Sequence, residues 1–222
     1  MNPDAIGRIK TGEAAGVDDL RLILVDPYSP LCAAFKTYFR DLPNVEIVND
    51  RFEELPRFDC FVTAGNCFGQ MDAGVDAAVV RFFGWPLMAQ VQEHILAEYL
   101  GEQPVGTSFI IETGHPEHPF VAHTPTMRVP MAIDRTDYVY NALWATLLEV
   151  RRHNRRSERR IEVLACPGLG TGYGQVPPVE AARQMALAYK HYLRPPDRLN
   201  WQIAALRHKD IRYGGNSPPP AQ

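Results

Sequence analysis

An apolar segment runs directly into a glycine-rich loop between residues 161 and 177, which read IEVLACPGLGTGYGQVP. The aliphatic residues from Ile161 to Ala165 predict a buried strand. Pro178, where the loop ends, is placed to begin a helix. Four glycines lie between positions 168 and 174. Because glycine permits positive φ and close approach to the backbone, this loop is a candidate binding site.

A second junction has the same layout. The apolar stretch FDCFVT at 58–63 leads into AGNCFGQMDAGVD at 64–76, where a helix is predicted to begin at Gly74. The carboxyl ends of strands form the ligand crevice of an open α/β sheet, and a helix start offers unpaired N–H groups with partial positive charge. Two such junctions facing one another are suited to hold a diphosphate without a lysine. For either loop alone, a simple chain reversal explains glycine about equally well.

The rest of the chain alternates between strand and helix patterns, which predicts an α/β sheet covered by helices on both faces. Strands are expected at 20–25, 45–48, 59–63, 107–112, 120–124 and 161–165, and helices at 29–40, 74–83, 86–100, 136–152 and 178–193, with a last amphipathic segment at 199–211.

Composition indicates one globular domain. The chain has 222 residues, 45% hydrophobic and 22% charged, with a net charge of −3, so it can bury a substantial core and is not a polyanion binder as a whole. We expect a loose N-terminal segment at 1–19, a single domain at 20–213 and a flexible tail at 214–222. No apolar run resembles a signal peptide or a transmembrane helix. The four cysteines form no CxxC pair, so a reduced, cytoplasmic protein with no metal and no cofactor is expected.

The standard nucleotide-binding motifs do not match. The loop at 168–174 lacks the Gly-Lys-Ser/Thr ending of a P-loop, and no acidic residue follows it where NAD-binding folds hold a ribose. A response-regulator receiver is also excluded. Such a domain needs paired acids after its first strand and an aspartate ending its third, whereas this chain has Asp26 alone and then Thr63-Ala64-Gly65-Asn66.

Taken together, these residues resemble the macrodomain family, of the ADP-ribose-binding, Appr-1-p processing type. The family commonly carries Asn-Ala-Ala-Asn where this chain has Thr63-Ala64-Gly65-Asn66, and Gly74-Val75-Asp76 is similar to the end of its Gly-Gly-Val-Asp stretch. Residues 170–174 resemble the family's second, phosphate-cradling loop, and Val121-Ala122-His123 resembles its Val-Ile-His strand. The PTMRVP segment at 125–130 is most similar to a bacterial and phage-like branch.

The resemblance implies a three-layer α/β/α fold with a mixed central sheet flanked by helices. It also implies ADP-ribose as ligand and, for some members, hydrolysis of ADP-ribosyl groups. Asp50 then accepts a hydrogen bond from the adenine, Asn66 contacts the distal ribose, and Asp76 positions or activates the attacking water. Further ligand-binding positions implied are Ala64, Gly65, Gly74, Val75, Gly168, Gly170, Thr171, Gly172, Tyr173 and Gly174.

Each assignment has a structural alternative. Asp50 is also suited to cap a turn, Asn66 to satisfy loop backbone, and Asp76 to stabilise a helix start. The chain departs from the family at residues 70–73, where QMDA replaces most of a glycine run. This change predicts a stiffer loop and a different hold on the ribose, which affects catalysis more than binding.

Other clusters point less clearly to a site. His115 and His118 predict a surface turn rather than a metal site, and His123 a hydrogen-bonded core histidine. The segment 151–160 holds six of the 23 basic residues, which as a helix end and turn favour solvent.

The resemblance implies two functions, and the basic segment suggests a third. The first is hydrolysis of ADP-ribosyl derivatives, namely protein-linked esters, O-acetyl-ADP-ribose or ADP-ribose 1″-phosphate. The second is a non-catalytic ADP-ribose-binding reader. The third is a nucleic-acid-associated protein that uses Arg151–Arg160. The expected partners are ADP-ribose or ADP-ribosylated molecules; no membrane partner is expected, and a nucleic acid is the least favoured.

Overall fold

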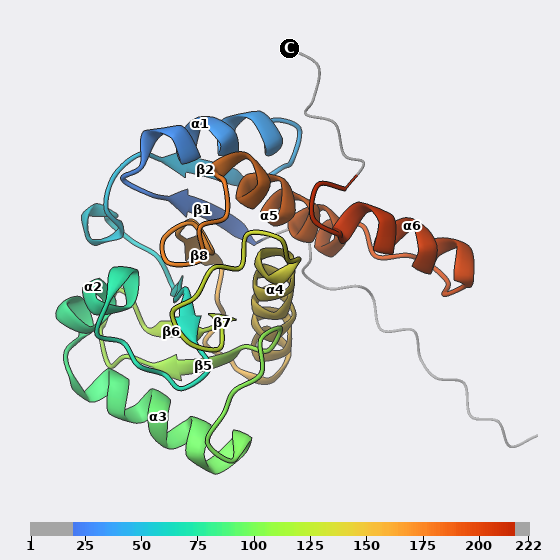
Figure 1. Cartoon of the computed structure of the whole chain (residues 1–222). Coiled ribbons are helices and arrows are strands. Elements are labelled where there is room, and N and C mark those ends of the chain that lie inside the picture. The colour runs from blue at the N-terminus through green and yellow to red at the C-terminus, as the bar shows by residue number, and fades with distance from the viewer. Residues whose placement is uncertain (1–19, 216–222) are drawn as a thin grey trace, which may run out of the picture.

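The structure, a computed structural model, describes residues 20–215 (Figure 1). A six-stranded sheet with the order β2-β1-β8-β3-β6-β5 forms its centre, and a two-stranded sheet joins β4 to β7. The pairs are parallel except β5–β6, which is antiparallel. The sheet is therefore mixed, as expected. The predicted N-terminal segment and residues 216–222 of the predicted tail lie outside the described residues.

The strands are β1 (Arg21–Val25), β2 (Val45–Val48), β3 (Cys60–Val62), β4 (Gly65–Asn66), β5 (Phe109–Glu112), β6 (Phe120–His123), β7 (Pro125–Met127) and β8 (Val163–Cys166). The helices are α1 (Ser29–Tyr38), the short 3-10 turn η1 (Phe52–Glu54), α2 (Gly74–Phe83), α3 (Pro86–Tyr99), α4 (Tyr138–Arg156), α5 (Pro178–Leu193) and α6 (Trp201–Ile211).

Alternating side chains of β1 divide the core into two layers. Leu22 and Leu24 pack in the cluster that includes buried residues of α1, α4 and α5. Ile23 and Val25 point to the other face, where their cluster includes residues of η1, α2 and α3. This period of two, buried on both sides, is what a sheet between two helical layers requires. The three-layer α/β/α prediction is confirmed.

The predicted bounds hold for β2, α2 and α5, while α4 continues to Arg156, beyond the expected end at 152. Two strands, β4 and β7, and the turn η1 were not predicted. No helix among the described residues is long and apolar enough to cross a membrane.

The C-terminal helix α6 is attached mainly through polar contacts. None of its residues is buried. Arg183 on α5 is 4% exposed and donates two hydrogen bonds of 2.7 Å to the Glu180 carboxylate. The same guanidinium donates to the carbonyl oxygens of Asp210 at 2.8 Å and Arg212 at 3.0 Å, where α6 ends and its carbonyls lack helical partners. The amide of Gly214, which we expected to be in the flexible tail, donates to Glu180 Oε1 at 3.2 Å.

Burial alone raises the pKa of Glu180, but hydrogen bonds from Arg183 and Gln184 and the Arg183 charge outweigh it and lower the pKa. Arg183→Met leaves this carboxylate buried without its partner. We expect that variant to lose about 3–5 kcal/mol of stability, and hydrogen exchange in α6 to quicken because the carbonyl cap is gone.

Glu180→Gln/Arg183→Met is the matched control. It removes the unpaired charge, so it should recover melting temperature while α6 still exchanges fast. If α6 stays protected in both variants, Arg183 does not hold this helix.

Candidate functional site

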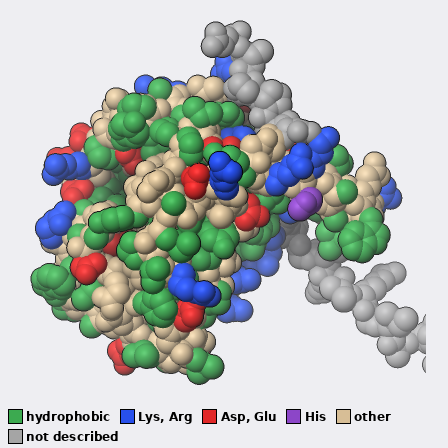
Figure 2. All heavy atoms as spheres, viewed as in Figure 1, with side chains coloured by type: hydrophobic (Ala, Val, Ile, Leu, Met, Phe, Trp, Pro, Cys, Tyr) green, Lys and Arg blue, Asp and Glu red, His purple; other side chains and the backbone are tan. Residues whose placement is uncertain are grey.

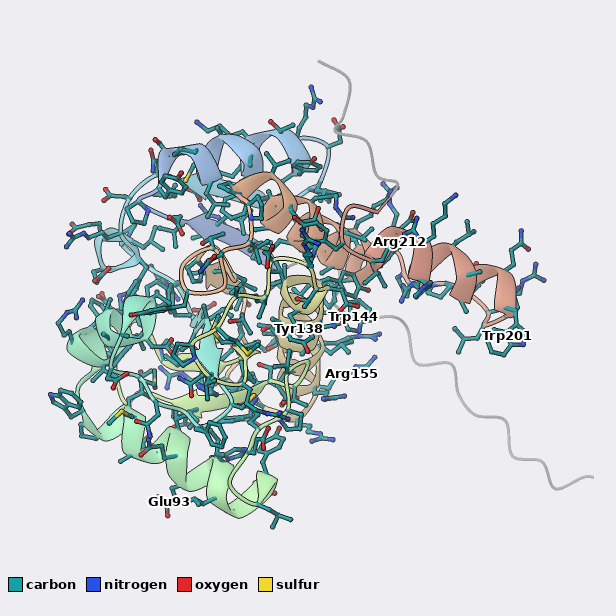
Figure 3. The ribbon with its side chains drawn as sticks, in the orientation of Figure 1. Glu93, Tyr138, Trp144, Arg155, Trp201 and Arg212 are labelled. Carbon is teal, nitrogen blue, oxygen red and sulfur yellow. The ribbon has the colours of Figure 1, made fainter. Side chains whose placement is uncertain are left out.

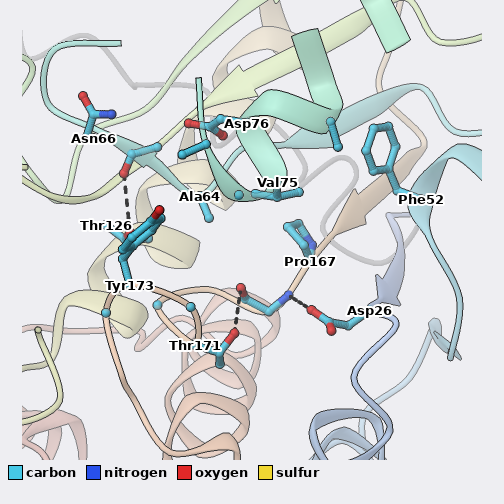
Figure 4. Close-up of a pocket in the computed structure, with 18 of the residues that line it drawn as sticks. Asp26, Phe52, Ala64, Asn66, Val75, Asp76, Thr126, Pro167, Thr171 and Tyr173 are labelled. Carbon is cyan, nitrogen blue, oxygen red and sulfur yellow. Dashed lines mark hydrogen bonds between the residues drawn. The ribbon is translucent and has the colours of Figure 1, made fainter. Parts of the chain in front are cut away.

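A cavity of about 420 Å³ opens where the sheet's strands end (Figure 4). Residues after β1, β3 and β8 line it together with the first turn of α2. Asn66 and Phe52 lie at opposite sides of this cavity, with Val75 and Asp76 between them and Thr171 and Tyr173 on the facing wall. Its position is the one where open α/β sheets bind ligands, and its volume suits a small organic molecule.

The glycine-rich loop after β8 contains glycines with two different roles. A Cβ on Gly168 would lie 2.1 Å from Leu31 Cδ2, and one on Gly174 would lie 2.4 Å from the Gly170 oxygen. Gly170 has a φ of +71°. Packing and conformation therefore require these three glycines. A Cβ on Gly172 meets nothing within 4 Å, so the fold does not need glycine there, and a side chain at this position would extend into the space beside the loop.

The same loop leaves a row of backbone donors unused. Within residues 20–215, nothing accepts a hydrogen bond from the amides of Thr171, Gly172, Tyr173 or Gly174. The loop's shape is held instead by the Gln175 and Val176 amides, which donate to the Gly172 and Gly170 oxygens at 3.0 Å each. Consecutive free amides beside a cavity form an anion-binding concavity.

The first turn of α2 supplies a second set of donors. Ala73 occupies the N-cap position and makes no side-chain capping bond. The amides of Gly74, Val75 and Asp76 have no acceptor in the described part of the chain, as expected for an uncapped helix start. Gly74 has a φ of +58°, and a Cβ there would also meet open space. Because these residues line the same cavity as the glycine loop, two sets of donors lie around one space.

Asp76 is the one buried carboxylate on this cavity. It is 5% exposed, and its Oδ1 has no hydrogen-bond partner in the described structure. Burial raises its pKa to about 7, although the helix start favours the charged form. A carboxyl group that exchanges its proton near neutral pH is suited to general acid/base chemistry.

Asn66 is used by its own loop. Its Oδ1 accepts hydrogen bonds from the amides of Phe68 at 3.1 Å and Gln70 at 3.3 Å. Its Nδ2 donates to the Gln70 oxygen at 2.7 Å. In the structure the Asn66 side chain therefore satisfies backbone groups of its own loop, as the structural alternative for this residue expected. The second hydrogen of Nδ2 remains for a ligand.

Asp26 connects the turn before α1 to the glycine loop. Its Oδ2 accepts the Gly168 amide at 3.1 Å and its Oδ1 the Tyr28 amide at 2.9 Å. Asp26 thus belongs to the turn before α1 and also anchors the glycine loop. Sequence reasoning missed this contact because it depends on β1 and β8 being neighbours, with Leu24 paired to Cys166.

Asp50 lies apart from the other predicted residues. It is exposed, and its Oδ1 accepts a hydrogen bond from the amide of the next residue, Arg51, at 2.8 Å. It is absent from the cavity lining, whereas Arg51 and Phe52 next to it are present. The remaining predicted positions all line the cavity: Ala64, Gly65, Asn66, Gly74, Val75, Asp76, Gly168, Gly170, Thr171, Gly172, Tyr173 and Gly174.

The strand pair β4–β7 positions the first loop. The Gly65 amide donates to the Thr124 oxygen at 3.0 Å, and Thr126 Oγ1 donates to the Gly65 oxygen at 3.4 Å. A Cβ on Gly65 would lie 2.6 Å from His123 Nε2, so packing requires this glycine. Thr126, Phe52, Arg51 and Arg81 also line the cavity and were not predicted.

His123 and His118 have structural roles. His123 is fully buried, shares a 2.6 Å hydrogen bond between its Nδ1 and Gln103 Oε1, and has a pKa lowered to about 3 by burial and the nearby His94 charge. The core assignment of His123 is confirmed. The surface assignment of His118 is wrong: it is 4% exposed and stacks on Phe58 with ring centroids 4.0 Å apart. The described residues contain no group of three or more His, Cys, Asp or Glu side chains placed to hold a metal.

The pKa of Asp76 predicts a pH-dependent stability cost. Because the folded pKa of about 7 lies above the ordinary value, stability falls as pH rises from about 4 to 7, by a few kcal/mol at most. Asp76→Asn is neutral throughout, so it should melt higher than the wild type at about pH 8. The difference should shrink toward about pH 4. A pH-independent difference in melting temperature would show that Asp76 does not titrate in this range.

Comparisons with known proteins agree with this geometry. A curated protein of Aquifex aeolicus, itself uncharacterized, is 28% identical over 142 residues, which are 64% of this chain and 78% of that protein. An uncharacterized protein of Saccharolobus solfataricus is 28% identical over 152 residues, 68% of this chain and 79% of its own length.

Solved macrodomains share the fold. A variant of the Oceanobacillus iheyensis macrodomain with ADPR has a TM-score of 0.57 at 18% identity, covering 88% of this chain and 94% of its own. The macrodomain of Mycobacterium tuberculosis DarG has a TM-score of 0.51 at 21% identity, covering 60% and 82%. A family model described as Macro domain matches residues 62–185, more than half of the sequence, and the chain therefore belongs to the Macro domain family.

Proposed function

We propose that this protein binds ADP-ribose in the cavity between the glycine loop and α2. The observation that carries the proposal is the convergence of two sets of unpaired backbone amides, at Thr171–Gly174 and Gly74–Asp76, on one cavity. Seven uncompensated amides suit a diphosphate, and a macrodomain of the same fold has been solved with ADPR. Gly172 then serves close approach of the phosphates, because nothing in the fold requires it.

In this proposal the two ends of the cavity hold different parts of the ligand. Phe52 and Asp26 line one side, and Asn66 lines the other beside Asp76. In this proposal the adenosine lies toward Phe52 and the distal ribose toward Asn66 and Asp76. An adenine contact by Asp50 requires that side chain to turn toward the cavity, whose lining includes the neighbouring Arg51 but not Asp50.

We further propose hydrolysis at the anomeric carbon of the distal ribose, as in an ADP-ribosyl ester of a carboxylate. The oxygen of a water forms a bond to C1″ while the C1″–O bond breaks and the carboxylate leaves with the bonding electrons. The water's proton passes to the ionised Asp76 and then to solvent. The unpartnered carboxylate with its pKa near 7 supports this role.

The alternative is a reader that binds without turnover. It is favoured by the internal hydrogen bonds of Asn66 and by Met71, which is fully buried and anchors the loop where the family has glycines. Both functions use the same cavity. A cytoplasmic location belongs to either proposal and is supported by four free, buried cysteines.

Replacing Gly172 tests the phosphate assignment. Gly172→Glu should lower ADP-ribose affinity by about a hundredfold or more, since it blocks the loop amides, each worth about 1.5–3 kcal/mol to a charged group, and adds like charge. Calorimetry with ADP-ribose measures this loss, with AMP and NAD alongside as specificity controls.

Gly172→Ala is the matched variant, because its Cβ meets no protein atom; it should melt like the wild type. If Gly172→Glu binds ADP-ribose with wild-type affinity, the loop around Gly172 does not hold the phosphates.

Turnover depends on Asp76. Asp76→Ala should slow release of ADP-ribose from an ADP-ribosylated carboxylate by about 10²–10⁴-fold and leave ADP-ribose affinity within a few-fold. Asn66→Ala should weaken both binding and release. Because the reaction needs the ionised carboxyl group, the wild-type rate should rise as pH passes upward through about 7.

The outcomes separate the two functions. If the wild type releases no ADP-ribose above background from ester-linked or acetylated substrates but binds it, the protein is a reader. If Asp76→Ala is as fast as the wild type, the water is held elsewhere, and Asp72 on the cavity rim is the next residue to replace.

A further inference from the structure

Charge is unevenly distributed along this chain. Residues 149–215 hold thirteen of the 23 Lys and Arg residues but only six of the 26 Asp and Glu residues. The overall charge of −3 therefore conceals a basic C-terminal third. In the fold this third comprises the C-terminal half of α4, β8, all of α5 and all of α6. Lys and Arg side chains gather along α6 and the adjoining flank of the domain (Figure 2).

One face of α4 carries both aromatic and basic side chains. Trp144, Arg151 and Arg155 follow at intervals of seven and four residues, which places them on one side of a helix. Tyr140 lies on the same side but is buried in the core. The Tyr140 and Trp144 rings are nearly parallel, with centroids 6.2 Å apart. Arg207 of α6 lies over the Trp144 ring at 5.4 Å, so α6 continues the same surface.

We define the α4–α6 surface by Trp144, Arg151, Arg155, Trp201 and Arg207. Trp144 and Arg155 lie on the α4 flank, while Trp201 lies at the free end of α6 (Figure 3). Trp201 is 90% exposed and Leu199 before it 88%. A tryptophan this exposed contributes nothing to the core and offers both faces of its ring.

The cations of this surface are not neutralised by the protein. Within the described chain, no carboxylate lies within 4.0 Å of Arg151, Arg155 or Arg207. The buried Nε of Arg151 has no hydrogen-bond acceptor there either. The charges of Arg151 and Arg155 both reach Tyr192 of α5 and act to lower its pKa, which burial raises. Guanidinium groups without a carboxylate partner favour an anionic partner.

We infer that the α4–α6 surface binds single-stranded nucleic acid, with phosphates on the arginines and a base stacked on Trp201. Single strands present phosphates and unstacked bases together, and proteins bind them with basic grooves that carry aromatic side chains. A duplex hides its base faces, and an acidic peptide has no flat ring to stack. This surface lies on α4 and α6 and shares no residue with the ADP-ribose cavity, so the inference does not rest on the proposed function.

Fluorescence anisotropy of a labelled oligothymidylate tests the inference with the full chain. We expect binding at low salt, with the logarithm of affinity falling by about 0.7 for each phosphate contact per unit logarithm of salt. Arg155→Glu/Arg207→Glu removes two phosphate contacts, so it should abolish binding or reduce the salt slope by about 1.4. Trp201→Ala should weaken binding by about tenfold through lost stacking.

Matched controls come from the same chain. Arg135→Glu changes an exposed arginine outside this surface, and Trp85→Ala removes a tryptophan that is 67% exposed at the start of α3. Both should bind the oligonucleotide like the wild type. All four variants should keep wild-type melting temperature and ADP-ribose affinity, which excludes misfolding.

Three results would overturn the inference. If the protein does not bind at low salt, or if Arg155→Glu/Arg207→Glu binds as well as the wild type, the α4–α6 surface is not a nucleic-acid-binding site. Displacement of the oligonucleotide by excess ADP-ribose places it in the cavity instead. If a duplex of the same length or polyglutamate binds with equal affinity, the surface binds any polyanion, and base stacking on Trp201 is excluded.

Discussion

The site depends on keeping backbone amides unpaired at the edge of a tightly packed domain. Four consecutive amides of this loop make no hydrogen bond within the described residues, so the loop must be held by other contacts. Gly168, Gly170 and Gly174 allow the loop to take this path, because a side chain at any of them would collide with protein atoms or strain the backbone. The Asp26 carboxylate fixes the start of the loop through the Gly168 amide. The donors are thus arranged before any ligand arrives, which lowers the entropic cost of binding.

The sheet and its helices could be predicted from the sequence because strongly periodic segments dominate the chain. Leu22 and Leu24 alternate with Ile23 and Val25, and both pairs are buried, so the pattern is unambiguous. The strands β4 and β7 could not be predicted, since two or three residues carry no periodicity. They form because the ends of β3 and β6 already lie side by side.

The candidate site could be located but not fully interpreted from the sequence. Both loops were recognised, and most predicted residues line one cavity. The separate roles of the glycines could not be read, because Gly172 and Gly174 differ only in what surrounds a Cβ. The contact between Asp26 and the glycine loop joins residues 142 positions apart, and no local pattern predicts such a pair.

Asp76 is where binding and catalysis make opposite demands on one proton. A reader needs a neutral acid, which donates a hydrogen bond to a ribose hydroxyl and does not repel the diphosphate. An enzyme needs the carboxylate. With the pKa near 7 in the empty site, both forms are populated at neutral pH. A bound diphosphate adds negative charge close to Asp76 and disfavours the ionised form. The pKa in the complex must therefore exceed that of the free protein. By the same linkage, ADP-ribose binds more tightly as pH falls through this range in an enzyme and in a reader alike. In an enzyme, the pH dependence of kcat then also lies at higher pH than that of kcat/KM.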